Sequence, residues 1–174
     1  MFAIVPSVGL SRSGGVPLPP RWQTAAVDPK YTLAFDRRFG RWFYPVHRRA
    51  YRLSGGLIGH RSPMGPMLLL TTTGRRSGEP RTTPLLYMPD GEDYLVVGSN
   101  GGRDRPPAWL LNLETLPAAE VQVRRKKTLV TAEVLRGDAA AAFWPRLTEH
   151  YEGWAYYQQL TDREIPVVRL VTTT

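Results

Sequence analysis

The fold is decided by one stretch of the chain, residues 67–88, which has the sequence MLLLTTTGRRSGEPRTTPLLYM. An apolar and β-branched run covers residues 67–73 and ends at Gly74, and a second run extends from Arg81 to Met88. Strand-forming residues on both sides of a short, glycine-containing bend are typical of neighbouring antiparallel strands. The stretch therefore predicts a β-hairpin whose bend is rich in arginine.

Similar strand patterns recur along the rest of the chain, at Tyr94–Ser99, Glu120–Arg125, Leu129–Leu135 and Ile165–Val171. Lys126-Lys127 lies between two of them and predicts a hairpin turn there. Helices are expected at Pro107–Leu113 and at 138–160, the second interrupted near Pro145 and Gly153. Strands joined by tight turns, with few helices between them, predict an α+β fold: an antiparallel sheet closed into a barrel, with peripheral helices.

Composition limits the chemistry. The 174 residues include no cysteine, which excludes disulfides, thiolate metal sites and cysteine nucleophiles, and the three histidines are too scattered to predict a metal site. Lysine and arginine number 23 against 15 acidic residues, for a net charge of +8. Nine arginines and no acidic residue lie between residues 37 and 78. This segment predicts a surface for a polyanion: phosphate, a poly-acidic ligand, anionic lipid or nucleic acid.

The chain divides into three expected parts. Residues 1–30 are predicted to be a poorly ordered extension, 31–54 a basic, aromatic helical segment, and 55–174 the barrel domain. Pro45 should divide or kink the helical segment. Two interpretations of this segment remain open: it packs on the domain with a solvated basic face, or it lies in a membrane interface. No run approaches the roughly 20 apolar residues that cross a bilayer, so we expect no membrane span.

The bend at residues 74–81, Gly-Arg-Arg-Ser-Gly-Glu-Pro-Arg, is the first candidate site. Its glycines allow backbone N–H groups to converge, and its arginines and Ser77 add donors, as anion binding requires. It is not a Walker loop, because the Gly-Lys pair of that motif is absent. The alternative is a hairpin turn with solvated arginines.

Two further patterns could carry chemistry. The first is the loop Gly98-Ser99-Asn100-Gly101-Gly102, whose glycines would let a flat ligand approach the backbone, with Ser99 as a hydrogen-bond donor. It does not match the nucleophile elbow of a hydrolase, because Val97 stands where that motif has its first glycine. Tyr151, Trp154 and Tyr157 are spaced by three and should lie on one side of a helix. They serve either as core packing or as the wall of a pocket.

The order of these motifs resembles the deazaflavin (F420)-dependent nitroreductase and quinone reductase family of the split β-barrel flavin/deazaflavin oxidoreductase superfamily. The resemblance extends from Tyr51 to Val171 and rests on these matching segments: Leu68–Gly78, Pro84-Leu85, Gly98-Ser99-x-Gly101-Gly102, Pro107-x-Trp109-x-x-Asn112-Leu113, and Tyr157-Gln158-x-x-Thr161-Asp162-Arg163-x-Ile165-Pro166. It implies an FMN-binding split-barrel type of fold.

The resemblance also implies roles for individual residues. Coenzyme F420 would be bound by Arg75, Arg76, Ser77, Arg81, Pro84, Leu85, Gly101 and Gly102. Ser99, Tyr151 and Tyr157 would be catalytic, and Trp154 would join the two tyrosines in the substrate wall. Trp109 and Asn112 would be structural supports. Two positions differ from relatives: Glu79 replaces a basic residue, and Trp154 replaces a tyrosine, so tail affinity and substrate choice should differ.

The implied activity is hydride transfer from reduced F420 to a quinone, nitroaromatic or enone. The alternatives are a split barrel that binds FMN, haem or biliverdin, a deazaflavin carrier without catalysis, and a nucleic-acid-binding module. The last is disfavoured because no aromatics interleave with the arginine bend as a stacking platform requires, so no nucleic-acid partner is expected. We expect a cytoplasmic protein. The alternative location is the inner face of the cell membrane, where the protein would make a peripheral contact with anionic lipid.

Overall fold

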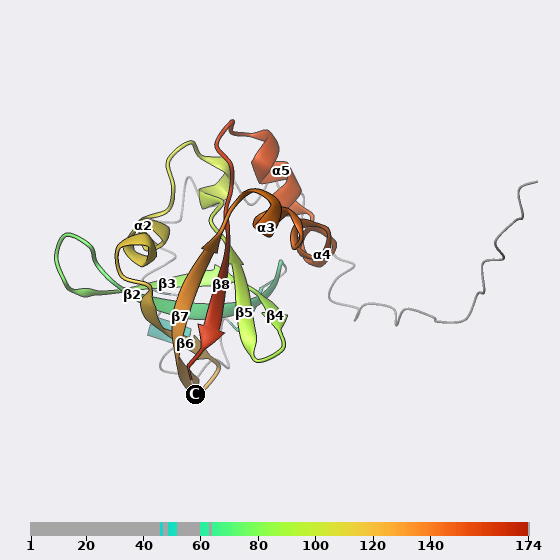
Figure 1. The fold of residues 1–174 in the computed structure, drawn as a ribbon. Helices are drawn as coiled ribbons and strands as arrows, with labels where there is room; N and C mark the ends of the chain where they lie inside the picture. The colour runs from blue at the N-terminus through green and yellow to red at the C-terminus, as the bar shows by residue number, and fades with distance from the viewer. Residues whose placement is uncertain (1–45, 47–48, 52–59, 63, 174) are drawn as a thin grey trace, which may run out of the picture.

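The structure, a computed structural model, describes residues 46, 49–51, 60–62 and 64–173 (Figure 1). Within this part of the chain, eight strands form one sheet, and neighbouring strands pair antiparallel. The strands are β1 (Arg61–Ser62), β2 (Gly65–Thr73), β3 (Pro80–Leu86), β4 (Met88–Asp90), β5 (Asp93–Val97), β6 (Ala118–Val123), β7 (Lys126–Leu135) and β8 (Val167–Thr172).

β3 and β4 are two halves of one bent strand, with only Tyr87 between them. β3 pairs with β2, and β4 pairs with β5. Because β2, β6, β7, β8 and β5 also pair in succession, the bent strand closes the sheet into a barrel. The predicted antiparallel split barrel is confirmed. The strand expected from Arg81 to Met88 is divided at Tyr87, where pairing passes from β2 to β5, although the Tyr87 N–H still donates to the Pro66 carbonyl of β2 at 3.2 Å.

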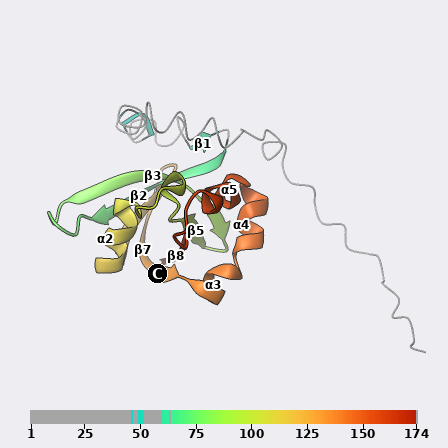
Figure 2. The same cartoon turned by 90° about the horizontal axis from the view of Figure 1, so that it is seen from above.

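Alternation along β5 separates two apolar clusters, since successive residues of a strand point to opposite faces. Val96 packs with side chains of β2, β6, β7 and β8 and with α2 (Ala108–Thr115), which contributes Trp109 and Leu110. Leu95 and Val97 pack in the second cluster, beneath helices α3 (Gly137–Ala141), α4 (Trp144–His150) and α5 (Gly153–Gln159). Seen from above, α2 and the α4–α5 pair lie on opposite sides of the barrel (Figure 2).

The helical segment expected at 138–160 consists of three short helices rather than one interrupted helix. Pro145 lies in the first turn of α4, where its missing N–H costs no hydrogen bond. Tyr151 has extended backbone angles and ends α4. α5 begins at Gly153, where a Cβ atom would lie 2.2 Å from the Tyr151 ring, so only glycine fits against that tyrosine.

Two tight turns connect the hairpins on the outside of the barrel. Gly91 begins the two-residue turn between β4 and β5, and its φ of +64° suits glycine. The β6–β7 turn consists of Arg124 and Arg125, and Arg124 has a φ of +54°. The expected turn at Lys126-Lys127 is therefore misplaced, since both lysines belong to β7 and pair with Val123 and Gln122.

The N-terminal predictions lie largely outside the described residues. This holds for the extension at 1–30 and for most of the helical segment at 31–54, of which Val46 and residues 49–51 are described and are helical. Tyr51 is completely buried: its hydroxyl donates to the Met67 carbonyl at 3.2 Å and accepts the Arg124 N–H at 2.9 Å. No helix of the described residues has the length and apolarity needed to span a bilayer.

Candidate functional site

The bend between β2 and β3 is closed by its own backbone. The Gly74 N–H donates to the Glu79 carbonyl at 2.8 Å, and the Gly78 N–H donates to the Gly74 carbonyl at 2.8 Å. A Cβ atom at Gly74 would lie 2.8 Å from the Ser77 hydroxyl, so glycine is needed there. The bend projects beyond the barrel on the side of α2 (Figures 1 and 2). It is a defined loop held out in solvent.

The side chains of this bend are exposed, and their charges are largely unneutralised. Arg75, Arg76 and Arg81 form no ion pair with Glu79 or with any other acidic residue of the described chain. The Ser77 hydroxyl organises part of the bend, because it accepts the Glu79 N–H at 3.3 Å and the Arg81 guanidinium at 3.4 Å. Three guanidinium groups and one carboxylate therefore face solvent from one small loop, as binding of a polyanion requires.

Asn112 anchors the bend to α2. This residue is 4% exposed. The amide oxygen accepts the Arg75 N–H at 3.1 Å and the Arg75 guanidinium at 3.3 Å, while the amide nitrogen donates to the Thr72 hydroxyl at 3.0 Å. Trp109 of the same helix is buried in the barrel cluster. These contacts agree with the supporting roles expected for Asn112 and Trp109.

The glycine loop after β5 precedes α2 and packs against both α2 and α5. Gly98 is confined, because a Cβ atom there would lie 3.0 Å from Leu110 of α2 and 3.1 Å from Pro166. Ser99 is buried. The short 3₁₀ turn η2 (Asn100–Gly102) follows, in which all three residues have positive φ. A Cβ atom at Gly102 would lie 2.8 Å from the Tyr157 carbonyl, so this glycine has a packing role against α5, and its role toward a ligand stays a prediction.

The three aromatic residues gather in space, although they do not share one helix. Tyr151 lies at the end of α4, whereas Trp154 and Tyr157 belong to α5. The Tyr151 hydroxyl lies 3.4 Å from the Tyr157 hydroxyl and 3.5 Å from the sulfur of Met64. Trp154 meets the Tyr151 ring edge-on at 5.5 Å and is only 3% exposed within the second apolar cluster. Core packing therefore accounts for Trp154, and the two phenols converge beside it.

Pro84 and Leu85 occupy neighbouring positions on β3 with different surroundings. Leu85 packs against the apolar cluster that contains Val96 and Trp109, and Pro84 is buried on the other face of the strand. Because proline has no N–H, Pro84 can offer a ligand only its carbonyl and ring. The structure thus places both residues on the strand that follows the arginine bend.

Arg163 is a functional candidate that the motif contained but to which the sequence assigned no role. Its guanidinium donates to the backbone carbonyls of Gly98 at 3.1 Å and Ser99 at 3.0 Å, and also to Arg103 at 3.3 Å. Burial lowers the pKa of this guanidinium, as does the nearby charge of Arg136, while Asp104 opposes the shift. Only contacts across 60 or more residues reveal this role, so no local sequence pattern could have indicated it.

The predicted site residues are thus connected through α2. Asn112 of α2 holds the arginine bend, and Leu110 of the same helix packs on Gly98. The glycine loop in turn contacts α5 through Gly102. The helix α2 therefore links the arginine bend, which is the candidate anion site, to the loop that carries Ser99.

Two other features do not form part of this site. A hollow of about 440 Å³ lies along β2, β6 and β7; none of the predicted site residues lines it, and its lining includes Thr71, Glu120, Leu129 and Thr173. No group of three or more metal-ligating side chains occurs among the residues that the structure describes.

Comparison with known proteins identifies the family. A family profile described as F420H(2)-dependent quinone reductase matches residues 43–172. The chain is 40% identical over 139 residues to an F420H(2)-dependent quinone reductase of Mycobacterium tuberculosis, covering 78% of this chain and 93% of the relative. A relative from Mycobacterium bovis shows the same identity and coverage.

A solved structure supports the same assignment. The structure of an F420-H2-dependent reductase (FDR-A) aligns with a TM-score of 0.56 and 37% identity, covering 60% of this chain and 93% of that chain. From the sequence alone, FMN, haem and biliverdin stay open as alternatives to the deazaflavin, and the names of these relatives favour the deazaflavin. The chain therefore belongs to the F420H2-dependent quinone reductase family, and it is an oxidoreductase whose hydride donor is reduced coenzyme F420.

Proposed function

We propose that this protein transfers a hydride from F420H2 to a quinone, and that nitroaromatics and enones are further acceptors. The observation that supports this most strongly is the anchored arginine bend, connected through α2 to the loop of Ser99 and to α5. An exposed cationic loop suits a ligand with an anionic arm. A buried serine next to confined glycines suits the reacting end of a flat molecule.

The residues of the bend fit the anionic part of the cofactor. Arg75, Arg76 and Arg81 would hold its phosphate and carboxylates, and Ser77 would add a hydroxyl donor. Arginine suits this task because its planar fork donates two hydrogen bonds to one anionic group. Glu79 places a carboxylate in the same bend and would weaken binding of the acidic tail by repulsion.

The opposite part of the site would position the acceptor. Bound F420H2 supplies the hydride, and the protein supplies orientation and a dry surrounding. Ser99 would donate a hydrogen bond to the acceptor oxygen on which negative charge develops. The phenols of Tyr151 and Tyr157, 3.4 Å apart, would contact the acceptor and hold its polar groups. Gly101, Gly102, Pro84 and Leu85 would allow close backbone approach to the ring system, and Trp154 would support the phenols from behind.

A peripheral contact with an anionic membrane is the proposed location, on the cytoplasmic side. Val46 is 67% exposed and Arg49 is exposed on the helix that Tyr51 fixes to the barrel. An apolar and a basic side chain one turn apart, both outward, are typical of helices that lie on lipid surfaces. Sedimentation with phosphatidylglycerol vesicles, reduced in Val46→Asp and Arg49→Glu but not in Arg105→Glu, would support this; equal sedimentation of all variants would contradict it.

The test of the proposed function combines binding and turnover. We expect F420 to bind in a fluorescence titration and F420H2 absorbance to change when a soluble quinone is added. Binding without turnover on any quinone, nitroaromatic or enone would instead identify a carrier. Arg76→Ala and Arg81→Ala should each weaken F420 binding about tenfold, as loss of a hydrogen bond between charged groups does. Unchanged binding in both variants would refute the assignment of the bend.

A further inference from the structure

We propose that Arg163 is a positioning residue, whose guanidinium sets the backbone of the Gly98–Arg103 loop and thereby the place of Ser99 relative to α5. This inference rests on the proposed function of Ser99. Arg163 lies in the connection between α5 and β8. It therefore acts from a segment that is distant in sequence from the loop that it holds.

The contacts of the guanidinium are unusually concentrated on backbone carbonyls. Its Nη2 atom lies 3.1 Å from the Gly98 oxygen, 3.0 Å from the Ser99 oxygen and 3.3 Å from the Arg103 oxygen. The Nε atom lies 3.4 Å from the Arg103 oxygen as well. One side chain thus contacts both ends of the loop and the residue that is proposed to meet the substrate.

The loop needs such a partner because Asn100, between Ser99 and two flexible glycines, is held in a left-handed conformation. Asn100, Gly101 and Gly102 have φ values of +50°, +65° and +73°. Left-handed conformations are costly for a residue with a Cβ atom such as Asn100 and persist only when the surroundings enforce them. Within the loop, the Gly102 N–H donates to Ser99 and the Arg103 N–H donates to Asn100. The Arg163 guanidinium adds hydrogen bonds from outside the loop that hold this backbone conformation.

A second set of hydrogen bonds ties the same two segments together. The Thr161 hydroxyl donates to the Asp104 carboxylate at 2.8 Å and accepts the Arg163 N–H at 3.2 Å. Gln158 of α5 donates to the Arg163 carbonyl at 2.9 Å. The segment that carries Arg163 is itself fixed, so its guanidinium is presented to the loop in one orientation.

Lysine cannot replace arginine in this arrangement. The Nη2 and Nε atoms, fixed in one plane, share the Arg103 carbonyl while Nη2 also reaches Gly98 and Ser99, whereas an ammonium group is a compact point charge on a flexible stem. The cofactor's anionic arm, by contrast, is assigned to the Arg75–Arg81 bend, and none of the contacts described above joins Arg163 to that bend. Loss of Arg163 should therefore affect turnover much more than binding of F420.

The experiment compares Arg163→Gln and Arg163→Lys with Arg169→Gln. Arg169 is a matched control because it is also a half-buried arginine, and within β8 it forms ion pairs with Asp90 and Asp93. We expect kcat with a soluble quinone to fall about 10- to 100-fold in both Arg163 variants, as small misplacements of reacting groups do. The F420 dissociation constant should stay within about twofold of the wild-type value, because the anion site is separate. Arg169→Gln should retain kcat.

Amide hydrogen exchange of residues 98–103 supplies a readout that does not depend on activity. Exchange there should accelerate about tenfold or more in the Arg163 variants and stay unchanged in Arg169→Gln, because the loop opens locally. Unchanged exchange, or unchanged kcat in a folded variant, would overturn the inference. A wild-type protein that reduces no acceptor would instead contradict the proposed function. If Arg163→Gln does not fold, Thr161→Val weakens the same connection and should show a smaller effect of the same kind.

Discussion

Asn112 and Arg75, separated by 37 residues in the sequence, are joined by two hydrogen bonds to a single amide oxygen. The same Asn112 side chain binds Thr72 on β2, so one buried amide connects the helix, the strand and the bend. A buried polar group is stable only when its hydrogen bonds are made. The cationic bend is therefore held in place by the fold of the barrel.

Replacing Asn112 tests this anchoring. Asn112→Leu should lower the free energy of unfolding by about 1–3 kcal/mol, because the Thr72 hydroxyl and the Arg75 N–H lose their buried partner. F420 affinity should fall as well, since the bend is released. Urea denaturation and fluorescence titration measure the two effects. Thr115→Val, which removes an exposed side-chain bond on the same helix, should change neither by much; an equal effect of both substitutions would contradict the anchoring role.

Replacing the carboxylate in the bend should increase the affinity for F420. Glu79→Lys should strengthen F420 binding about tenfold at low salt, because repulsion of an anionic tail becomes attraction, and the gain should shrink as salt screens the charges. Titrations at two ionic strengths measure it. Glu149→Lys makes the same charge change on the exposed surface of α4 and serves as the control. A gain of the same size in that control would mean that net charge alone is responsible.

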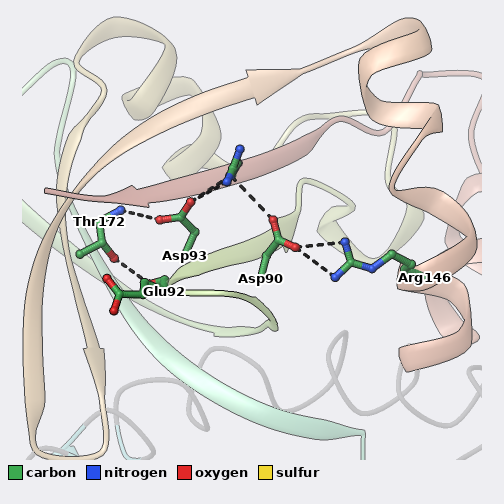
Figure 3. A network of polar contacts seen from close by, with 6 residues as sticks. Asp90, Glu92, Asp93, Arg146 and Thr172 are labelled. Atoms are coloured by element: carbon green, nitrogen blue, oxygen red, sulfur yellow. Dashed lines mark hydrogen bonds and ion pairs between the residues drawn. The ribbon is translucent and has the colours of Figure 1, made fainter. Parts of the chain in front are cut away.

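An ion-pair network connects α4 to strands β4, β5 and β8 (Figure 3). Asp93, 14% exposed in its side chain, binds Arg169 at 2.8 Å and accepts the Thr172 N–H at 2.9 Å. Asp90 pairs with Arg146 at 3.0 Å, but the Arg146 side chain is 54% exposed. Asp93→Ala should lower the free energy of unfolding by about 1–3 kcal/mol, because it leaves a backbone donor unpaired.

Arg146→Gln should cost less than about 1 kcal/mol, as exposed pairs do. Both variants are compared by urea denaturation at neutral pH. A larger loss in Arg146→Gln than in Asp93→Ala would show that burial does not decide the strength of these contacts.

His150 makes stability depend on pH. Burial lowers the pKa of its imidazole from the usual 6.5, partly offset by a hydrogen bond with the Tyr87 backbone, and the ring stacks on Trp154 at 6.2 Å. Between the lowered folded pKa and 6.5, the unfolded chain binds more protons than the folded one. Stability should therefore be complete above about pH 7 and decline as the pH falls through 6.5 towards the folded value, by up to about 1.4 kcal/mol per pH unit.

Thermal or urea unfolding at pH 7.5 and pH 5 measures this decline. His150→Phe keeps an aromatic ring against Trp154 and removes the titrating group, so its stability should change less between the two pH values. An identical pH dependence in wild type and variant would assign the effect to other groups.

Local patterns predicted much of the sheet correctly. The alternation and turn residues of 67–88 placed β2 and β3 and their bend, because side-chain period and turn chemistry are local properties. The same local reasoning missed the break at Tyr87, where the partner strand changes from β2 to β5 and one strand becomes β3 and β4. It also placed the β6–β7 turn too late, because Arg124 adopts a left-handed conformation that non-glycine residues seldom take.

The amino-acid order by itself determined the antiparallel barrel, the family and the identity of the cationic bend, since these depend on residue types at short spacings. Only the tertiary structure decided that Asn112 anchors that bend, that Tyr151 and Tyr157 meet from different helices, and that Arg163 holds the loop of Ser99. Those relationships join residues that are far apart along the chain or that lie on either side of a helix break. They arise when buried polar groups find partners during packing, and no short sequence window contains both members of the long-range pairs.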